Sequence, residues 1–319
     1  MLDNKQLCSE LIRALRKRRS QAAFSRRLGF ATNVVHTWET GRRMPSTTDF
    51  MLAASKSGVD VQARLNSFFH GEARSKPSPK LGAKGFVPEL LGLLRGDLRP
   101  ATLARSVGAT RLTVGRWLVG SSEPRLPQLL RFVAGTTQRL LDFVALFADP
   151  EALASTHAAW RDLQAQRRVA YELPWSHAVL RALELARYKQ LSQHEPGFIA
   201  RLLGLPLSVE NEALNALSQA RQIRLLRGKW AVARVLTVDT RPDPAKNLAL
   251  KRHWAEVGVQ RIGQEGLFSY NLCSIAEADY QRLQSLHRAY FEQMRAVIAG
   301  SRGGDRILLA NVQLFSLTP

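Results

Sequence analysis

Residues 21–46 read Gln21-Ala-Ala-Phe-Ser-Arg-Arg-Leu-Gly-Phe-Ala-Thr-Asn-Val-Val-His-Thr-Trp-Glu-Thr-Gly-Arg-Arg-Met-Pro-Ser46. Gly29 lies between two apolar stretches, and glycine most easily adopts the positive φ angle of a sharp turn between helices. The large apolar residues on either side recur at helical spacing, so they can pack two short helices into one core. These residues are Phe24, Leu28, Val35 and Trp38. The stretch therefore predicts two helices joined at Gly29.

The second of these helices, expected around Thr32–Thr40, has a polar face opposite its apolar one. Four side chains share that face because they are spaced i, i+1, i+4 and i+5 along the helix. They are Thr32, Asn33, His36 and Thr37. Each of them can hydrogen-bond to the edge of a base in duplex DNA. Any solvated helical hairpin also displays a polar face, so the charge of the flanking sequence matters.

Basic residues surround this pair of helices. The chain of 319 residues carries a formal net charge of +20, and residues 1–80 alone hold 15 basic and 6 acidic side chains. Lysine and arginine supply the phosphate contacts that dominate affinity for nucleic acids. Those in and beside the motif are Arg16, Lys17, Arg18, Arg19, Arg26, Arg27, Arg42 and Arg43. We therefore expect the N-terminal quarter to contact a polyanion.

The pattern returns farther along the chain, which indicates an internal repeat. Six landmarks coincide without gaps at one constant spacing, here called the repeat offset, which carries Gly29 onto Gly108. They are Phe24, Gly29, Val35, Trp38, Gly41 and Pro45, matched by Leu103, Gly108, Val114, Trp117, Gly120 and Pro124. The second copy offers Arg111 and Arg116, and arginine pairs well with guanine. The alternative is a duplicated module that keeps the fold and only packs against its neighbour.

Residues 21–46 resemble the helix-turn-helix of the lambda-repressor and Cro class of regulators, also called the xenobiotic-response-element type. The matching residues are Gln21, Leu28, Gly29, Val35, Trp38, Glu39, Gly41 and Pro45. By this resemblance, Thr32, Asn33, His36 and Thr37 would read the major groove, and Gln21, Arg42 and Arg43 would contact phosphates, with Arg18 and Arg19 beside them. The resemblance also implies a homodimer on an operator of inverted symmetry.

The remaining sequence divides by composition and periodicity into further modules. We expect a mainly α chain whose first helix-turn-helix bundle spans 1–70 and whose second spans 85–149, joined by a basic linker at 71–84. A helical connector follows at 150–195, then a winged helix at 196–240 with a hairpin turning at Gly228. Residues 241–319 are expected to form a small α+β domain, with strands at 267–273 and 307–317 around a helix.

The start of the expected recognition helix of the winged module carries Glu210 and Glu212. Carboxylates facing phosphates would be repelled, so this module is expected to have an architectural or dimerisation role. Residues 171–319 are similar to the C-terminal half of a poorly characterised family of bacterial regulators. This similarity supports a role in regulation but supplies no ligand, so an effector or protein partner of the C-terminal half is expected without an identity. The similar stretches begin at Trp175, Pro196 and Asn311.

Catalytic and cofactor signatures are missing from the sequence. No glycine-rich loop ends in Gly-Lys-Ser, no dinucleotide fingerprint occurs, and the seven histidines lack metal-ligand spacing. Cys8 and Cys273 are too few for a secreted disulfide scaffold, and we find neither a long apolar run nor a signal peptide. A cytoplasmic, nucleoid-associated protein without enzymatic activity, cofactor, metal or membrane contact is expected.

These observations predict a transcription regulator that binds double-stranded DNA in a sequence-specific manner. Two other interpretations stay open. In the first, the C-terminal half binds a protein or small effector while DNA contact is incidental. In the second, the chain is a replication or plasmid-partition initiator, which would also carry several DNA-binding modules.

Overall fold

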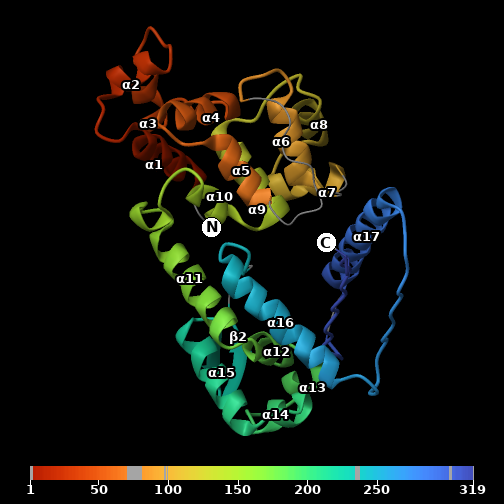
Figure 1. Cartoon of the computed structure of the whole chain (residues 1–319). Coiled ribbons are helices and arrows are strands. Elements are labelled where there is room, and N and C mark those ends of the chain that lie inside the picture. The colour runs from red at the N-terminus through yellow and green to blue at the C-terminus, as the bar shows by residue number, and fades with distance from the viewer. Residues whose placement is uncertain are drawn as a thin grey trace. The chain divides into compact units, whose positions relative to one another are not determined.

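The computed structural model describes residues 3–69, 81–96, 98, 100–233, 238–301 and 304–318. Residues 71–80 of the expected linker lie outside this range. The chain divides into two compact units, Met1–Asp162 and Leu163–Pro319, here called the N-terminal and C-terminal units. Both are built mainly from helices (Figure 1), so the expected mainly α class is confirmed.

The N-terminal unit begins with five short helices. They are α1 (Asn4–Arg16), α2 (Gln21–Arg27), α3 (Val34–Glu39), α4 (Thr47–Lys56) and α5 (Val61–Phe69). A polar residue caps the start of each of the first four, because its side chain accepts a hydrogen bond from a backbone N–H that the helix leaves unpaired. These caps are Asp3, Ser20, Asn33 and Ser46.

Five further helices follow in the same order. They are α6 (Phe86–Arg95), α7 (Pro100–Val107), α8 (Arg111–Leu118), α9 (Leu126–Thr137) and α10 (Leu140–Ala145). The starts of α7, α9 and α10 follow those of α2, α4 and α5 at the repeat offset seen in the sequence. A 3-10 turn, Pro150–Ala152, then leads to α11 (His157–Glu172), which begins in the N-terminal unit.

One hydrophobic core serves both sets of five helices. Phe24, Val35 and Trp38 from the first set and Leu103, Val114 and Trp117 from the second belong to the same buried cluster, each at most 3% exposed. Phe68 of α5 packs edge-on against Phe143 of α10, with ring centroids 5.7 Å apart. The two sequence repeats therefore form a single packed body.

In the C-terminal unit, helices and a hairpin surround a second core. The helices are α12 (Trp175–Ala182), α14 (Phe198–Leu203) and α15 (Leu207–Gln219), with a short α13 (Ala186–Lys189) between the first two. Strands β1 (Ile223–Leu226) and β2 (Lys229–Val232) pair antiparallel, Ile223 opposite Val232. They turn at Arg227 and Gly228, which both have positive φ angles, as a two-residue hairpin turn requires.

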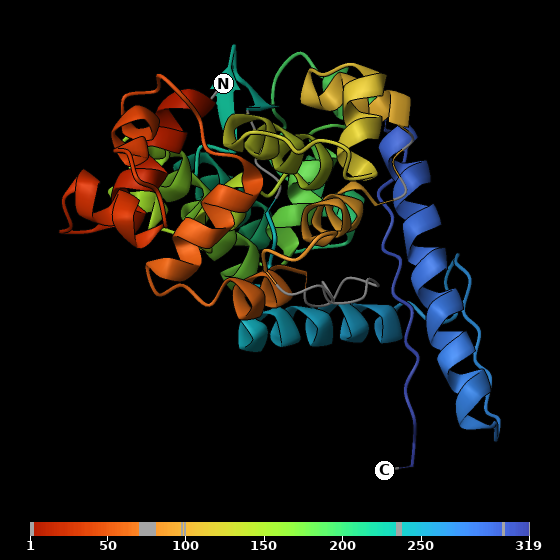
Figure 2. The ribbon, with the colours of Figure 1, turned by 90° about the horizontal axis from the view of Figure 1, so that it is seen from above.

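The expected strands at 267–273 and 307–317 are wrong. Between and around α16 (Pro244–Gln260) and α17 (Glu277–Gly300), the described residues after Val232 contain no strand. Figure 2 shows the segment that follows α17 as an extended trace without a strand. The physical reason is exposure: Leu267 is 104% and Leu308 83% exposed, and an alternating apolar pattern forms a sheet only where other strands and a core can cover it.

Candidate nucleic-acid interface

The turn between α2 and α3 depends on Gly29. Its φ angle is +91°, and a Cβ atom placed there would meet nothing within 4 Å. The glycine is therefore required by backbone conformation and not by crowding. Gly108 takes the same place between α7 and α8, with φ +65°. In both copies the turn brings the next helix onto the shared core through a buried valine and tryptophan.

Asn33 starts α3 as its N-cap. Its Oδ1 accepts a hydrogen bond from the backbone N–H of His36 at 3.3 Å and lies 3.2 Å from the hydroxyl of Ser25. Ser25 Oγ in turn accepts the N–H of Val35 at 3.0 Å. The helix expected around Thr32–Thr40 accordingly runs from Val34 to Glu39. The amide nitrogen of Asn33 is the part of the side chain that remains for a ligand.

A chain of polar contacts holds α3 against α1 and α2. Gln21 Oε1 lies 3.2 Å from His36 Nδ1, and Gln21 Nε2 donates to Glu39 Oε2 at 2.7 Å. Glu39, whose side chain is 4% exposed, also accepts from Arg16 Nε at 2.6 Å. The side chain of Gln21, expected at phosphate, is thus engaged with α3. The sequence offered no signal for the pair Arg16–Glu39, which are 23 positions apart.

The four expected base-reading side chains of the first copy lie together at α3 but differ in exposure. Thr32 and Asn33 are exposed, whereas His36 and Thr37 are half-buried. Thr37 Oγ1 donates to the carbonyl of Val34 at 2.7 Å, so its hydroxyl can still accept a hydrogen bond. The exposed edge is therefore formed by Thr32 and Asn33, directly before the first residue of α3, whereas the two expected residues within the helix are half-buried.

The basic residues near α3 fall into two groups. Arg27 Nε and Lys17 Nζ donate to the carbonyls of Lys56 and Ser57 at 2.7 and 3.0 Å, where they satisfy the C-terminal end of α4. The second group has no hydrogen bond or ion pair from its side chains within the described part of the chain. It consists of Arg18, Arg19, Arg26, Arg42 and Arg43, of which all but the half-buried Arg19 are exposed.

The second copy presents its own pair of arginines. Arg111 and Arg116 of α8 are exposed, and their guanidinium groups make no hydrogen bond or ion pair within the described residues. The helix is capped by Thr110, whose Oγ1 accepts the N–H of Thr113 at 3.1 Å. Leu112, 67% exposed, lies between them in sequence. Both expected guanine-contacting residues are therefore free to meet a ligand.

Glu210 in the C-terminal unit does not face solvent as expected. It is fully buried, and its carboxylate accepts the backbone N–H groups of Gly197 at 3.2 Å and Ala200 at 2.5 Å. From α15 it therefore caps α14, where a carboxylate is favoured by the unpaired N–H groups. Only Glu212 remains exposed, so the repulsion argued from both carboxylates rests on one of them.

Hydrogen bonds from the half-buried His194 and Lys229 attach the hairpin β1–β2 to this region. His194 donates its backbone N–H to the Gly228 carbonyl at 2.8 Å, and its ring lies 3.2 Å from the Tyr188 hydroxyl and 3.6 Å from the Glu210 carboxylate. Burial lowers the pKa of His194, while Glu210 and Glu195 act against that shift. Lys229 Nζ donates to the carbonyls of Lys189 and Leu191, both at 2.8 Å.

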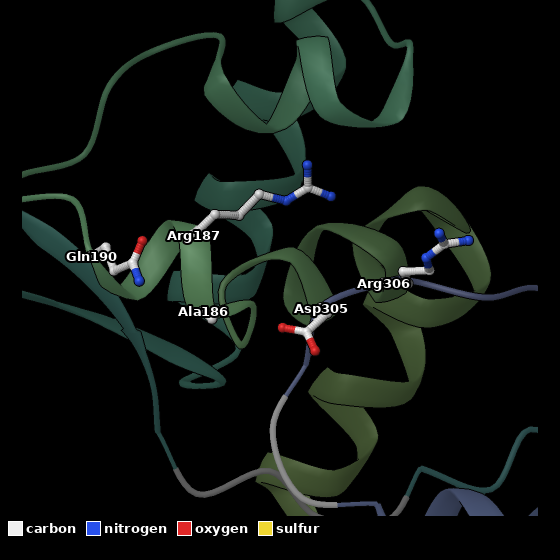
Figure 3. A pocket seen from close by; sticks show the side chains of 5 residues that line it. All are labelled: Ala186, Arg187, Gln190, Asp305 and Arg306. Atoms are coloured by element: carbon white, nitrogen blue, oxygen red, sulfur yellow. The ribbon is translucent and has the colours of Figure 1, made fainter.

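A hollow of about 450 Å³ lies in the C-terminal unit between α13 and residues 305–306. It is lined by Ala186, Arg187, Gln190, Asp305 and Arg306. Figure 3 shows that Arg187 and Arg306 do not point toward a common position, and Arg306 is paired with Glu265 at 3.0 Å. This hollow therefore lacks the converging polar groups of a small-molecule site.

Two further features were sought in the described residues. No group of three or more histidine, cysteine, aspartate or glutamate side chains among them is arranged to hold a metal ion. Of the helices that the structure describes, none combines the length and the apolar character needed to cross a membrane.

Comparison with known proteins adds one result. No curated protein and no solved structure matches the chain. Residues 154–317, which cover half of it, match the family model described as "Domain of unknown function (DUF4423)". The match includes α12, α14, α15, the hairpin and both long C-terminal helices, and it leaves out the ten helices of the repeat. The chain therefore belongs to the DUF4423 family.

Proposed function

We propose that this protein is a transcription regulator that binds DNA in a sequence-specific manner and reads the major groove with α3. One observation carries the proposal: α3 is locked into the core by Val35 and Trp38, while its exposed edge lies beside arginines that have no partner in the described chain. Thr32 and Asn33 on that edge can hydrogen-bond to bases, and Arg42 and Arg43 can neutralise phosphates.

The same proposal assigns the finer architecture. The two sets of five helices are tandem helix-turn-helix bundles, and α14, α15 and the hairpin are a winged helix whose role is architectural. The C-terminal unit, with exposed Leu267, Tyr270 and Leu272, would bind an effector or protein partner. The protein would act in the cytoplasm on the nucleoid, by binding and without catalysis.

Selection from a randomised duplex library, performed with the full chain at one fixed salt concentration, tests the proposal. An enriched sequence is expected, and Thr32→Val and Asn33→Ser should reduce the preference for it over scrambled DNA. Threonine and valine have the same shape, and serine keeps the N-cap oxygen that alanine would remove. The first change removes the Thr32 hydroxyl and the second removes the two amide N–H donors of Asn33, while α3 keeps its cap.

The phosphate contacts are tested by the double variant Arg42→Gln/Arg43→Gln. It should weaken binding to all duplexes alike and lower the slope of log affinity against log salt by about 0.9 for each lost contact. The matched control is Lys251→Gln/Arg252→Gln, which removes two adjacent exposed charges of the C-terminal unit. Equal losses in the two double variants, or no enriched sequence at all, would contradict the proposal.

A further inference from the structure

The two repeats of the N-terminal unit meet through hydrogen bonds that are reciprocal. Thr47 donates its backbone N–H to the Pro124 carbonyl at 3.0 Å, and Leu126 donates its own to the Pro45 carbonyl at 2.9 Å. At the repeat offset, Leu126 is the equivalent of Thr47, and Pro124 is that of Pro45. Between them Ser46 and its own equivalent, Arg125, form an antiparallel bridge. Equivalent residues that pair with each other define a two-fold axis.

Side-chain hydrogen bonds add to the contact between the two repeats on both sides of the Ser46–Arg125 bridge. Thr47 Oγ1 donates to the Pro124 carbonyl at 2.8 Å, and Glu123 Oε2 accepts from the N–H and hydroxyl of Thr48 at 3.1 and 2.7 Å. Arg125 Nη1 donates to the Met44 carbonyl at 3.3 Å. Thr47 is fully buried, so its contacts are shielded from water.

A second set of contacts follows the same symmetry farther along the repeats. Phe68 of α5 packs on Phe143 of α10, and the positions equivalent to this pair are Phe147 and Arg64. Arg64 Nη1 donates to the carbonyl of Leu146, directly before Phe147, at 2.8 Å. Phe68, Phe143 and Phe147 belong to the same buried cluster as Val35 and Trp38 of α3 and Val114 and Trp117 of α8. This shared core holds α3 and α8 at a fixed separation.

The ends of α3 and α8 are separated from the two-fold axis by the same number of residues. Ser46 follows the end of α3 by seven residues, and Arg125 follows the end of α8 by the same number. Seven residues reach at most ~25 Å. Half-sites on one face of DNA are ~34 Å apart, so each helix needs to be ~17 Å from the axis. The connections are long enough for this geometry.

The positions expected to read bases differ between the two copies, although both helices bury a valine and a tryptophan at equivalent positions. Equivalent at the repeat offset are Thr32 and Arg111, Asn33 and Leu112, His36 and Gly115, and Thr37 and Arg116. None of these pairs is alike. The connections differ too, since Arg42 and Arg43 correspond to Ser121 and Ser122. Arginine favours guanine, so α8 would select bases that α3 does not.

We propose that one chain binds DNA as its own two-fold unit, with α3 and α8 reading two half-sites of inverted orientation and different sequence. The inference rests on the proposed function. It replaces the homodimer on a symmetric operator with a single chain on an asymmetric one. The half-site under α8 contains guanine opposite Arg111 and Arg116.

The number of chains per site is the first test. The full chain is mixed with the duplex enriched by selection, and the mass of the complex is measured by mass photometry. One 35.6 kDa chain per duplex and a titration without cooperativity are expected. Two chains per duplex would overturn the inference.

Half-site preferences are the second test. Arg111→Ala/Arg116→Ala should relax the preference in one half of the site by roughly 5- to 150-fold for each lost base contact, and Thr32→Val/Asn33→Ser should relax the other half only. A site read by α3 alone, on which the Arg111→Ala/Arg116→Ala variant behaves as the unaltered chain, would overturn the inference and leave the proposed function standing.

A transplant of the reading residues is the third test. The variant Arg111→Thr, Leu112→Asn, Gly115→His and Arg116→Thr gives α8 the side chains found at the equivalent positions of the first copy. Gly115 has no positive φ angle and no atom within 4 Å of an added Cβ, so the helix can accept the change. Selection with this variant should yield an inverted repeat of the half-site under α3. Recovery of the original asymmetric site would overturn the inference, whereas absence of any enriched sequence with the unaltered chain would overturn the proposed function itself.

Discussion

Replacing Glu39 by glutamine removes the charge at the centre of the contacts that hold α3 against α1 and α2. The carboxylate accepts hydrogen bonds from Arg16 Nε at 2.6 Å, from Arg16 Nη2 at 3.3 Å and from Gln21 Nε2 at 2.7 Å. A glutamine side chain has one acceptor oxygen for these three donors, and its own amide nitrogen is a fourth donor. At least one donor is left without a partner in a site where Glu39 is 4% exposed.

The loss of folding free energy depends on how deeply Glu39 and Arg16 are each buried. Breaking a fully buried ion pair costs about 3–5 kcal/mol, and a hydrogen bond to a charged group contributes about 1.5–3 kcal/mol. Arg16 keeps 19% of its side chain exposed, so water recovers part of its solvation. We therefore expect Glu39→Gln to lower the free energy of unfolding by about 2–3 kcal/mol.

Native-state hydrogen exchange measures this loss locally, which matters because a chain of two units need not unfold in one step. Amides of α1 and α3 should exchange about 30- to 140-fold faster, since about 1.4 kcal/mol corresponds to a factor of ten. The control is Glu151→Gln, the same change in an exposed pair with Arg161, where a loss of at most about 1 kcal/mol is expected. Equal exchange rates in both variants would refute the reasoning.

Three further predictions concern single groups. Glu210→Gln should lower the protection of α14 amides by about 1–3 kcal/mol, because a buried cap is lost, whereas the exposed Glu212→Gln should leave hydrogen exchange unchanged. Burial lowers the pKa of His177 and His194 below their ordinary 6.5, so the unfolded chain takes up protons more readily than the folded one. The melting temperature of the C-terminal unit should therefore be highest above pH 6.5 and fall as the pH drops below it. A higher melting temperature at low pH would contradict this. Gly29→Ala should cost about 1–2 kcal/mol from backbone strain alone, and an unchanged melting temperature would show that the turn does not need its positive φ angle.

Much of the N-terminal unit could be predicted because its signals are local. The spacing of Phe24, Val35 and Trp38 is a property of neighbouring residues, and so is the positive φ angle that Gly29 supplies. The repeat offset was visible because each copy carries the same local pattern, and α7, α9 and α10 begin at the positions that match the starts of α2, α4 and α5. The hairpin turn at Gly228 was equally local.

The errors and omissions arose where distant residues decide the environment. Asn33 was expected to hydrogen-bond to a base, and the sequence did not show that its side-chain oxygen caps α3. Glu210 was expected to face phosphates, but Gly197 and Ala200 bury it. The apolar alternation at 267–273 and 307–317 reads as strand, and a strand exists only where another part of the chain pairs with it.

In the N-terminal unit, the order of residues by itself determined which segments are helical, where they turn and which sides face inward, because helix periodicity and turn chemistry act over a few positions. Tertiary structure decided which polar side chains remain free for a ligand, since that depends on partners far away in sequence, such as Arg16 for Glu39. It also decided that the repeats face each other across the Ser46–Arg125 bridge: a repeat in the sequence states that two modules are alike, and only packing determines the symmetry that relates them.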